Sequence, residues 1–185
     1  MVAFACGQAD AFALLFERYN QPLFGFFARR VAEPAVAEEL AQETFLALLR
    51  AASRYQPTAL FRTYIYAVAF KILSAHRRKV AFRSLFLGKP DAENQPDAGP
   101  SEHSSVLANL LVRQAIARLD NLDREVLLLR EFEQLSYTEI AEVLRLPLNT
   151  VRSRIFRARS ALQEILSAPA HTTFAAPQMG FEEQV

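Results

Sequence analysis

A group of arginines near the end of the chain offers the clearest chemistry. Five arginines and no acidic residue lie between Arg145 and Arg159. Guanidinium groups donate hydrogen bonds to phosphates and to the edges of bases in the major groove. The alternative is an ordinary solvated basic face, but such faces usually carry counter-charges on the same turns, and this segment has none. The pattern therefore favours a surface that contacts DNA.

Helical phase separates this segment into two faces. An apolar stripe is expected to pack inward, and it consists of Val151, Ile155, Ala158, Leu162 and Ile165. The candidate DNA-binding residues lie opposite or beside this stripe: Asn149, Thr150, Arg152, Ser153, Arg154, Phe156 and Arg157. Those near the start of the helix suit base edges, whereas Arg154 and Arg159 are better placed for DNA backbone contacts or salt bridges.

A second helix is predicted immediately before the arginine-rich one. Ser136 followed by Glu139 is the pattern of a capping box, and Ile140 and Leu144 give the buried face. The next helix opens after a tight turn, near Leu148. A short helix, a tight turn and a second helix that carries the arginines are the layout of a helix-turn-helix.

Basic and aromatic residues are interleaved in an earlier segment, 61–83, which contains no acidic residue. Its cations include Arg62, Lys71, Arg77, Arg78 and Lys79, and Tyr64, Tyr66 and Phe70 lie among them. This combination suits a single nucleic-acid strand, because phosphates need cations and exposed bases stack on aromatic rings. An aromatic core with a solvated basic end is the alternative, and it accounts for Ile65, Val68, Ala69 and Ile72.

Acidic and amide side chains share one face of the helix predicted before that segment. Glu39, Gln42 and Glu43 project together at three- and four-residue spacing. The core candidates of the same helix are Leu40, Phe45, Leu48 and Leu49. Taken without any family motif, an ordinary solvated acidic face is the favoured interpretation.

Periodicity predicts an all-α fold. Apolar residues recur at helical steps from 10 to 30, with a kink or short break expected at Pro22, and further helices are predicted at about 34–53 and 61–79. Three prolines and two glycines then mark a flexible linker in 88–101. Helical periodicity resumes near 105 and continues to about 166, with breaks near 120, 135 and 147.

These patterns divide the chain into two small helical domains joined by a flexible linker. The expected boundaries are an N-terminal domain at 1–82, a linker at 83–105, a helix-turn-helix domain at 106–167 and a disordered tail at 168–185. A linker of about 25 residues can extend to roughly 80 Å, whereas two turns of B-DNA measure about 70 Å. The tether therefore permits simultaneous contacts two turns apart without fixing their spacing.

Composition narrows the function classes. The net charge of the 185 residues is only +1, so any affinity for nucleic acid must come from local charge clusters. The lone Cys6 excludes an internal disulfide and a thiolate zinc site, and the three histidines lack metal-ligand spacing, so we expect no metal and no cofactor. Because the chain has no long apolar run and no signal-peptide pattern, we expect a cytoplasmic protein without a membrane segment.

Residues 119–166 resemble the C-terminal domain of bacterial sigma factors. The resemblance rests on REVLLLR (124–130), LSYTEIA (135–141), and TVRSR (150–154) followed by RAR (157–159). It implies binding to the minus-thirty-five promoter element in the major groove and contact with the flap of the polymerase β subunit. Asp120 stands where proline is usual and can cap the next helix. Asn149 stands where glycine is usual and tolerates a left-handed turn.

Residues 37–45 (AEELAQETF) resemble the signature with which sigma factors dock on the β′ clamp helices of core RNA polymerase. By this resemblance the core-polymerase-binding residues are Glu39, Leu40, Gln42 and Glu43. An acidic, amide-bearing patch suits a basic coiled coil, because charge-assisted hydrogen bonds then form. The resemblance thus favours docking over the solvated acidic face.

The following loop and helix resemble the part of the family that holds the minus-ten element, with one base flipped into a pocket that maps to residues 55–61. The residues that this resemblance assigns to the minus-ten region are Tyr55, Arg62, Tyr64, Lys71, Arg77, Arg78 and Lys79. Tyr64 replaces a usual tryptophan, Lys71 a usual asparagine and Ala75 a usual aspartate. These departures affect the expected promoter sequence rather than the class of ligand.

Together the two resemblances cover about 10–79 and 107–166, and they identify the chain as a member of the extracytoplasmic-function (ECF) group of sigma factors. Membership implies a non-enzymatic promoter-recognition subunit whose partners are core RNA polymerase, promoter DNA and usually an anti-sigma factor. The alternative is a two-domain helix-turn-helix regulator with an N-terminal sensor domain, although no phosphoacceptor pocket on alternating strands is recognisable. A nucleic-acid enzyme such as a resolvase would need a catalytic serine or carboxylate cluster, and none is found.

Overall fold

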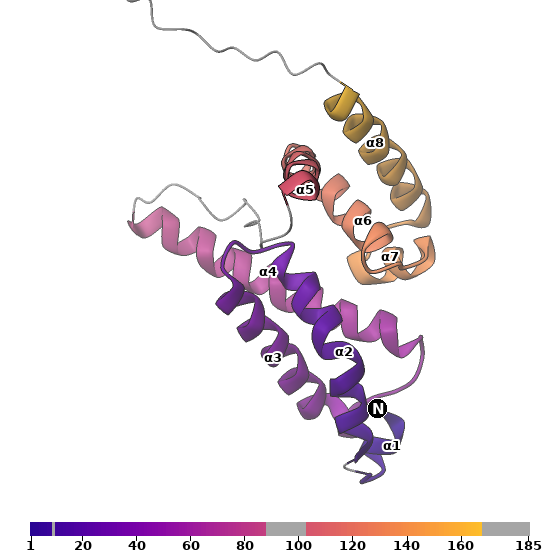
Figure 1. Cartoon of the computed structure of the whole chain (residues 1–185). Coiled ribbons are helices and arrows are strands. Elements are labelled where there is room, and N and C mark those ends of the chain that lie inside the picture. Colours follow the sequence, from indigo (N-terminus) through magenta and orange to yellow (C-terminus); the bar gives the residue numbers. More distant parts are fainter. Residues whose placement is uncertain (9, 88–102, 168–185) are drawn as a thin grey trace, which may run out of the picture.

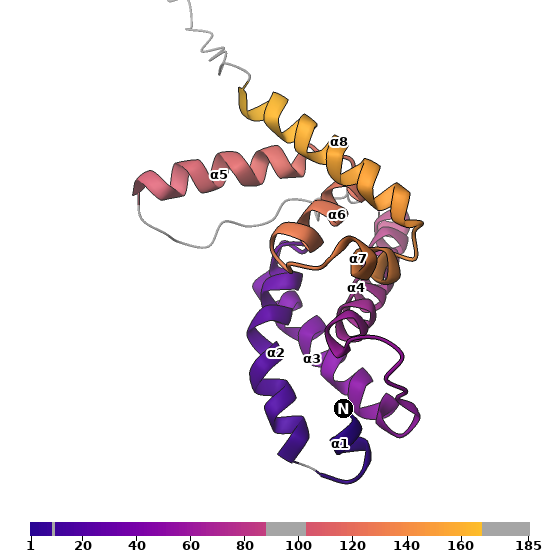
Figure 2. The ribbon, with the colours of Figure 1, turned by 90° about the vertical axis from the view of Figure 1, so that its right-hand side faces the viewer.

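The computed structural model describes residues 1–8, 10–87 and 103–167, and its regular elements are helices (Figures 1 and 2). The N-terminal half contains α1 (Val2–Ala5), α2 (Asp10–Ala28), α3 (Pro34–Ala51), a 3-10 turn (Ala52–Arg54) and α4 (Phe61–Leu87). The C-terminal half contains α5 (His103–Ala117), α6 (Asn121–Glu131), α7 (Tyr137–Leu144) and α8 (Leu148–Ser167). The predicted all-α fold with a C-terminal helix-turn-helix is confirmed.

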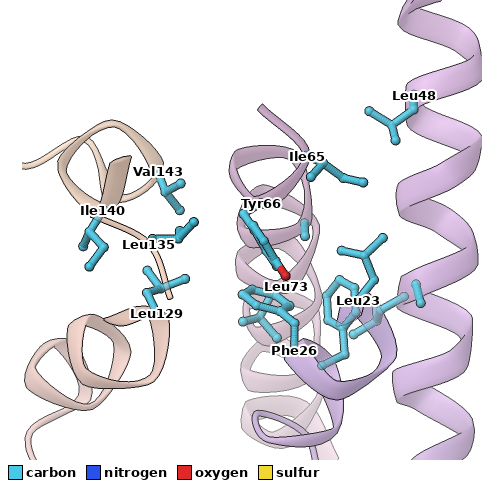
Figure 3. Close-up of a cluster of buried hydrophobic side chains, with 14 of the residues drawn as sticks. Leu23, Phe26, Leu48, Ile65, Tyr66, Leu73, Leu129, Leu135, Ile140 and Val143 are labelled. Carbon is cyan, nitrogen blue, oxygen red and sulfur yellow. The ribbon is translucent and has the colours of Figure 1, made fainter. Parts of the chain in front are cut away.

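Helices α2, α3 and α4 form a bundle around a core of large apolar side chains. Leu23, Phe26, Leu48, Ile65 and Leu73 are fully buried where the three helices meet (Figure 3). Burying such side chains contributes about 1.5–3 kcal/mol each, so this core dominates the stability of the bundle.

Two details of the bundle differ from the sequence prediction. The sequence predicts a kink or a short break at Pro22, but α2 runs through Pro22 without a break, and Pro22 itself is exposed. The helix loses only one hydrogen bond there, while packing of Leu23 and Phe26 immediately after it holds the chain in the helix. Leu49, predicted to be in the core, is 37% exposed, because it lies one helical step away from the buried Leu48.

Helix α4 is longer than predicted. It continues to Leu87 instead of ending near Lys79, so the linker prediction, which began at 83, starts too early. The physical reason is that neither glycine nor proline occurs between 61 and 87, whereas Gly88 and Pro90 follow directly. The linker prediction also ends too late, at 105, because α5 begins at His103. Its remaining part, 88–102, and the predicted tail, 168–185, lie outside the described residues.

Local capping sets the helix-turn-helix. The Asp120 carboxylate accepts a hydrogen bond from the Leu122 backbone N–H at 3.0 Å and caps α6. Ser136 and Glu139 form the predicted capping box at the start of α7. The left-handed residue of the turn before α8 is Arg145, with φ of 54°, and not Asn149, which lies within the first turn of α8. The prediction for Asn149 is therefore wrong, because the turn closes four residues earlier.

The two halves of the chain pack against each other. Helix α7 lies along α4, and one buried apolar cluster runs from the bundle into α6 and α7. Figure 3 shows Leu129, Leu135, Ile140 and Val143 on the side of Tyr66 of α4. Sequence patterns predict two tethered domains, and nothing in those patterns indicated this contact.

Candidate nucleic-acid interface

Helix α8 presents an open polar face. Val151, Ile155 and Ala158 are buried, as helical phase predicts. The opposite side is exposed and carries Asn149, Arg152, Ser153, Phe156 and Arg157, while Thr150 is half-buried. Phe156 stands out because a large apolar side chain is 73% exposed between arginines. Exposed donors and an exposed apolar ring at the start of a recognition helix suit base edges and thymine methyl groups in a major groove.

Carboxylates of α6 already engage part of the arginine set on α8. Arg154 donates to Asp123 at 2.9 Å and to Asp120 at 3.3 Å, and its side chain is three-quarters buried. Arg159 donates to Glu131 at 2.7 Å. These pairs fix α8 on α6, and salt bridges are one of the two roles predicted for both arginines. The hydrogen bond from the Leu122 N–H, with a smaller contribution from Arg154, lowers the pKa of the Asp120 carboxyl.

Arg152 and Arg157 are the arginines of α8 most open to a ligand. Arg157 makes only a long contact with Asp123, at 3.4 Å, and its side chain is 58% exposed. Arg152 reaches Asn149 Oδ1 of the same helix at 3.5 Å and is exposed. Both guanidiniums can therefore turn toward a phosphate or a base without breaking a buried contact.

A second open face runs along α4. Helical phase aligns Tyr64, Lys71 and Arg78 on one side of the helix with Lys79 beside them, and the three cations are exposed. The same side continues into the exposed rings of Phe82 and Phe86, whose centroids are 4.6 Å apart. Cations and exposed rings on one helix face are the arrangement that suits a single strand.

A pocket of about 160 Å³ lies where the sequence predicts a base pocket, at the loop before α4. Its lining is Tyr55, Gln56, Thr58, Ala59, Thr63, Tyr64, Ala67 and Glu142. The rings of Tyr55 and Tyr64 lie 5.0 Å apart. Burial, with a smaller contribution from Tyr64, raises the pKa of the Tyr55 hydroxyl, which therefore stays protonated and can donate a hydrogen bond. Glu142 comes from α7, so the helix-turn-helix forms part of the wall.

Two cations predicted to bind the minus-ten element, Arg62 and Arg77, are already paired with carboxylates. The Arg62 guanidinium donates to both Glu139 oxygens, at 2.8 and 2.9 Å from Nη2, and Thr63 Oγ1 donates to Oε1 at 3.1 Å. Arg77 pairs with Glu125 at 2.9 Å. Both carboxylates belong to the C-terminal half, so the structure separates Arg62 and Arg77 from the exposed Lys71, Arg78 and Lys79.

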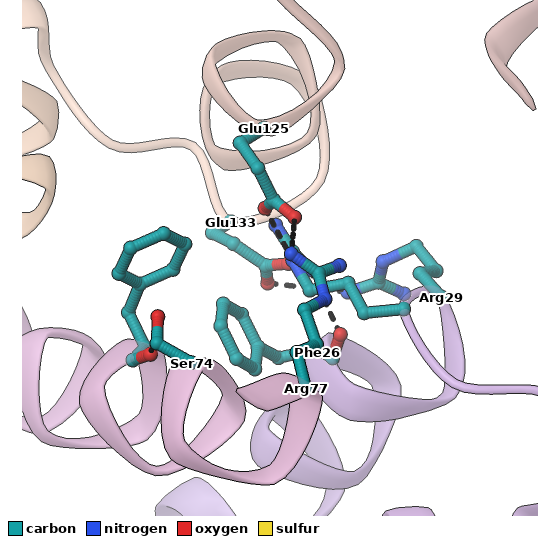
Figure 4. Close-up of polar contacts among 8 residues, drawn as sticks. Phe26, Arg29, Ser74, Arg77, Glu125 and Glu133 are labelled. Atoms are coloured by element: carbon teal, nitrogen blue, oxygen red, sulfur yellow. Dashed lines mark hydrogen bonds and ion pairs between the residues drawn. The ribbon is translucent and has the colours of Figure 1, made fainter. Parts of the chain in front are cut away.

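Figure 4 shows a buried charge cluster between the halves that sequence reasoning missed. Arg30, with a fully buried side chain, donates to Glu125 at 2.8 Å and to Glu133 at 3.3 Å. Arg29 donates to Glu133 at 3.0 Å. The only signal in the sequence was that these charges fall at otherwise apolar helix positions, which does not reveal the partner.

Two carboxylates between the halves, Glu125 and Glu139, are held in the charged form. Burial alone raises the pKa of Glu125, but the guanidiniums of Arg30 and Arg77 more than offset this and hold the pKa below its usual range. For Glu139, burial likewise raises the pKa, and hydrogen bonds from the Ser136 N–H and from Arg62 bring it below the usual range. The pairs that Glu125 and Glu139 make across the interface are therefore full ion pairs near neutral pH.

The acidic face of α3 is open. Glu39, Gln42 and Glu43 are exposed, and Leu46 continues the same side at 47% exposure. Leu40, which the family resemblance placed among the docking residues, is 3% exposed and packs in the bundle core. Leu40 therefore anchors α3 in the bundle core and is not part of the exposed acidic face.

Other classes of site are not visible in the part of the chain that the structure describes. Residues 1–8, 10–87 and 103–167 hold no group of three metal-binding side chains. Within the same residues, every helix is too short or too polar to cross a bilayer.

An arginine-bearing helix-turn-helix joined to a helical bundle with its own basic, aromatic face defines a two-domain DNA-binding protein. Residues 15–82 match the family described as Sigma-70 region 2, and residues 109–162 match Sigma-70 region 4. The chain belongs to the sigma-70 family, in which it is a sigma factor of the ECF type that directs transcription initiation.

Two relatives agree with this assignment, and a solved structure shares the fold. The RNA polymerase sigma-H factor of Pseudomonas aeruginosa is 33% identical over 86% of this chain and 88% of its own length. The ECF RNA polymerase sigma-E factor of Haemophilus influenzae is 31% identical over 85% of this chain and 88% of its own length. The sigma factor RpoE from Bartonella quintana, solved in complex with the anti-sigma factor NepR, shares the fold with a TM-score of 0.75 at 18% identity, covering 87% of this chain and 99% of that one.

Proposed function

We propose that this sigma factor binds core RNA polymerase and reads a promoter at two places. The observation that carries the proposal is the presence of two separate open faces of cations and rings, on α8 and on α4, in a molecule whose net charge is only +1. Such a chain binds duplex DNA weakly by itself, because the attraction comes from a few local charges. Polymerase would then fix the spacing between the two contacts.

The two faces suit different states of DNA. The start of α8, with Arg152, Ser153, Phe156 and Arg157 exposed, suits the major groove of the upstream, minus-thirty-five element. The α4 face, with Lys71, Arg78 and Lys79 next to the Tyr55–Tyr64 pocket, suits the separated strand of the minus-ten element and one flipped base.

Two protein partners complete the proposal. Core RNA polymerase would be bound at two places: the open acidic face of α3 would dock on the β′ clamp helices, and the helix-turn-helix half would contact the β flap. An anti-sigma factor is the second expected partner, supported by a fold shared with a sigma factor solved in complex with one.

Run-off transcription with purified core enzyme tests the proposal. Core enzyme alone should not initiate at a cognate promoter, and addition of this chain should give a defined transcript. Initiation at the same start site without the chain contradicts the proposal. Failure to co-purify with core polymerase would instead favour a helix-turn-helix regulator with an N-terminal sensor domain.

The division between the two faces has its own test, permanganate footprinting of melted thymines. Replacing Arg78 and Lys79 by alanine should leave recruitment largely intact and impair strand opening. Arg77 is left unchanged, because its pair with Glu125 would confuse a folding effect with a DNA effect. Impaired recruitment with normal opening at saturating holoenzyme would show that the α4 face does not hold the melted strand.

A further inference from the structure

The turn between α7 and α8 closes on an arginine in an unfavourable backbone conformation. Arg145 has φ of 54° and ψ of 48°, which is the left-handed region. A residue with a side chain enters this region at a cost in free energy, because its Cβ comes too close to the following carbonyl oxygen. Glycine, which has no Cβ, is the usual residue at a helix end of this kind. Arg145 therefore makes the turn less stable than glycine would.

The surrounding structure holds position 145 in this conformation. The Arg145 backbone N–H donates to the Glu142 carbonyl at 3.3 Å, and the Leu146 N–H donates to the Ala141 carbonyl at 2.9 Å. This pair of hydrogen bonds is the Schellman motif, which is built around a left-handed residue. Leu144 and Leu146, on either side of Arg145, pack against the buried apolar cluster. The turn thus imposes the left-handed conformation on any residue that stands at 145.

The Arg145 side chain does not stabilise the fold through any polar contact of its own. It is exposed, and within the part of the chain that the structure describes its guanidinium makes no recorded ion pair or hydrogen bond. Arg154 and Arg159, in contrast, are paired with carboxylates of α6. Backbone strain of this kind clusters at ligand-binding sites, where the strained residue is needed for binding. The strained and unpaired Arg145 is therefore a candidate for contact with a ligand.

The position of Arg145 suits a phosphate as that ligand. Arg145 stands three residues before Leu148, where α8 begins, and the turn runs directly into the start of this helix (Figure 2). In a helix-turn-helix the N-terminal end of the second helix enters the major groove, so residues just before it lie at the groove edge, where the phosphates are. A guanidinium binds phosphate oxygens through charge-assisted, often paired, hydrogen bonds.

We propose that Arg145 binds a DNA phosphate at the edge of the minus-thirty-five groove, and that it occupies the strained position because of this contact. The inference rests on the proposed function, since it adds a residue to the DNA-binding face of α8. With Arg152 and Arg157, it gives the start of the recognition helix three open cations. A phosphate contact carries no sequence information, so Arg145 raises the affinity for all sequences alike.

Arg145→Gly tests the proposal because it acts on stability and on DNA binding in opposite directions. Glycine relieves the left-handed strain, so the urea midpoint, followed by circular dichroism, should rise. The same change removes the cation, so the affinity for duplex DNA should fall, by the same factor for duplexes of different sequence. A solvated arginine without a phosphate contact would give only the first effect.

Fluorescence anisotropy of a labelled duplex, titrated with the full chain over a series of low salt concentrations, measures the contact. We expect the slope of log K against log salt concentration to be smaller by about 0.9 in Arg145→Gly, because one fewer phosphate is neutralised. Arg145→Lys keeps a cation in the same backbone conformation and should retain most of the slope. The cations of α4 are unchanged in all of these variants, so they do not affect the comparison.

Gln134→Gly is the matched control. Gln134 also has φ of 54°, and it is exposed and uncharged. Glycine there should raise the urea midpoint as well, while the salt slope stays that of the unaltered chain. An Arg145→Gly chain that binds DNA with the unaltered slope, or that is no more stable than the unaltered chain, overturns the proposal. An unaltered chain without salt-dependent binding to any duplex contradicts the proposed promoter reading itself.

Discussion

Single residues on α8 divide into those that hold the helix and those that are free to bind. Arg154 is three-quarters buried against Asp120 and Asp123, whereas Arg157 is more than half exposed and makes one long contact. Arginines of the same charge on one helix therefore have two different roles. Only the three-dimensional position of the α6 carboxylates separates them.

Arg157→Ala tests the binding role. If Arg157 contacts a base bidentately, the change should cost about 1–3 kcal/mol in promoter binding and relax specificity at one position. If it contacts only a phosphate, affinity should fall almost equally for all sequences and the salt slope should shrink by about one. Holoenzyme binding titrations on matched and single-mismatch promoters measure both. A high concentration of the Arg157→Ala holoenzyme should restore opening of the promoter strands. If strand opening stays blocked at saturating holoenzyme, Arg157 does not act in recruitment.

Asp120 acts on stability through a cap. Its carboxylate accepts a hydrogen bond from Leu122 N–H, so Asp120→Ala should lower the free energy of unfolding of the C-terminal half. Asp120→Asn is the matched control, because asparagine caps helices about as well as aspartate and should be close to neutral. Urea unfolding followed by circular dichroism measures the difference. Equal losses in both variants would assign the effect to charge instead of capping.

At the scale of elements, one face of α3 is exposed and does not contribute to packing of the bundle. Leu40, Phe45 and Leu48 fasten the helix to the core, and the opposite side, with Glu39, Gln42 and Glu43, touches no other helix through a recorded ion pair or hydrogen bond among the described residues. Surface substitutions of this kind usually change stability by less than about 0.5 kcal/mol. Their effect on binding can therefore be measured without a folding effect.

Replacing Glu39, Gln42 and Glu43 together by alanine should weaken binding to core polymerase and leave the helical circular-dichroism signal intact. The physical reason is the loss of charge-assisted hydrogen bonds to a basic coiled coil. Fluorescence anisotropy of the labelled chain titrated with core enzyme gives the affinity. Glu17→Ala, an exposed acidic position on α2, is the control. Unchanged affinity in the triple variant would show that this acidic face is only solvated and does not bind core polymerase.

At the scale of the whole molecule, the packed arrangement depends on pH. Glu125 faces Arg30 of α2 and Arg77 of α4, and Glu139 faces Arg62 of α4. Both carboxyls have pKa values below the usual value of 4.5. A lowered folded-state pKa contributes stability that is present above about 4.5 and is lost as the pH falls through the lowered value.

We therefore expect the packed form to loosen as the pH is lowered below about 4.5. Small-angle X-ray scattering should report an increasing radius of gyration while circular dichroism shows that the helices persist. The Glu133→Gln, Glu139→Gln chain should open at a higher pH than the unaltered chain, because it begins with fewer interface pairs. A radius that stays constant down to the pH at which helices melt would show that these carboxylates do not govern closure.

The sequence by itself determined the local features of this protein. Helical periodicity, the Ser136–Glu139 capping box and the two faces of α8 all follow from side chains within a few turns of one another, and the structure confirms them. The likeness to sigma factors also rests on short local motifs. The sequence missed the length of α4 and the left-handed residue of the turn, because boundaries depend on small differences in local free energy.

Only the tertiary structure decided which cations are free. Arg62 and Glu139 are separated by 77 positions, and Arg30 and Glu125 by 95, so no local pattern pairs them. Their contact depends on α7 packing along α4, which fills one continuous apolar cluster across both halves. For that reason the sequence identified a basic face on α4 but could not show that Arg62 and Arg77 are already occupied, while Lys71, Arg78 and Lys79 remain open.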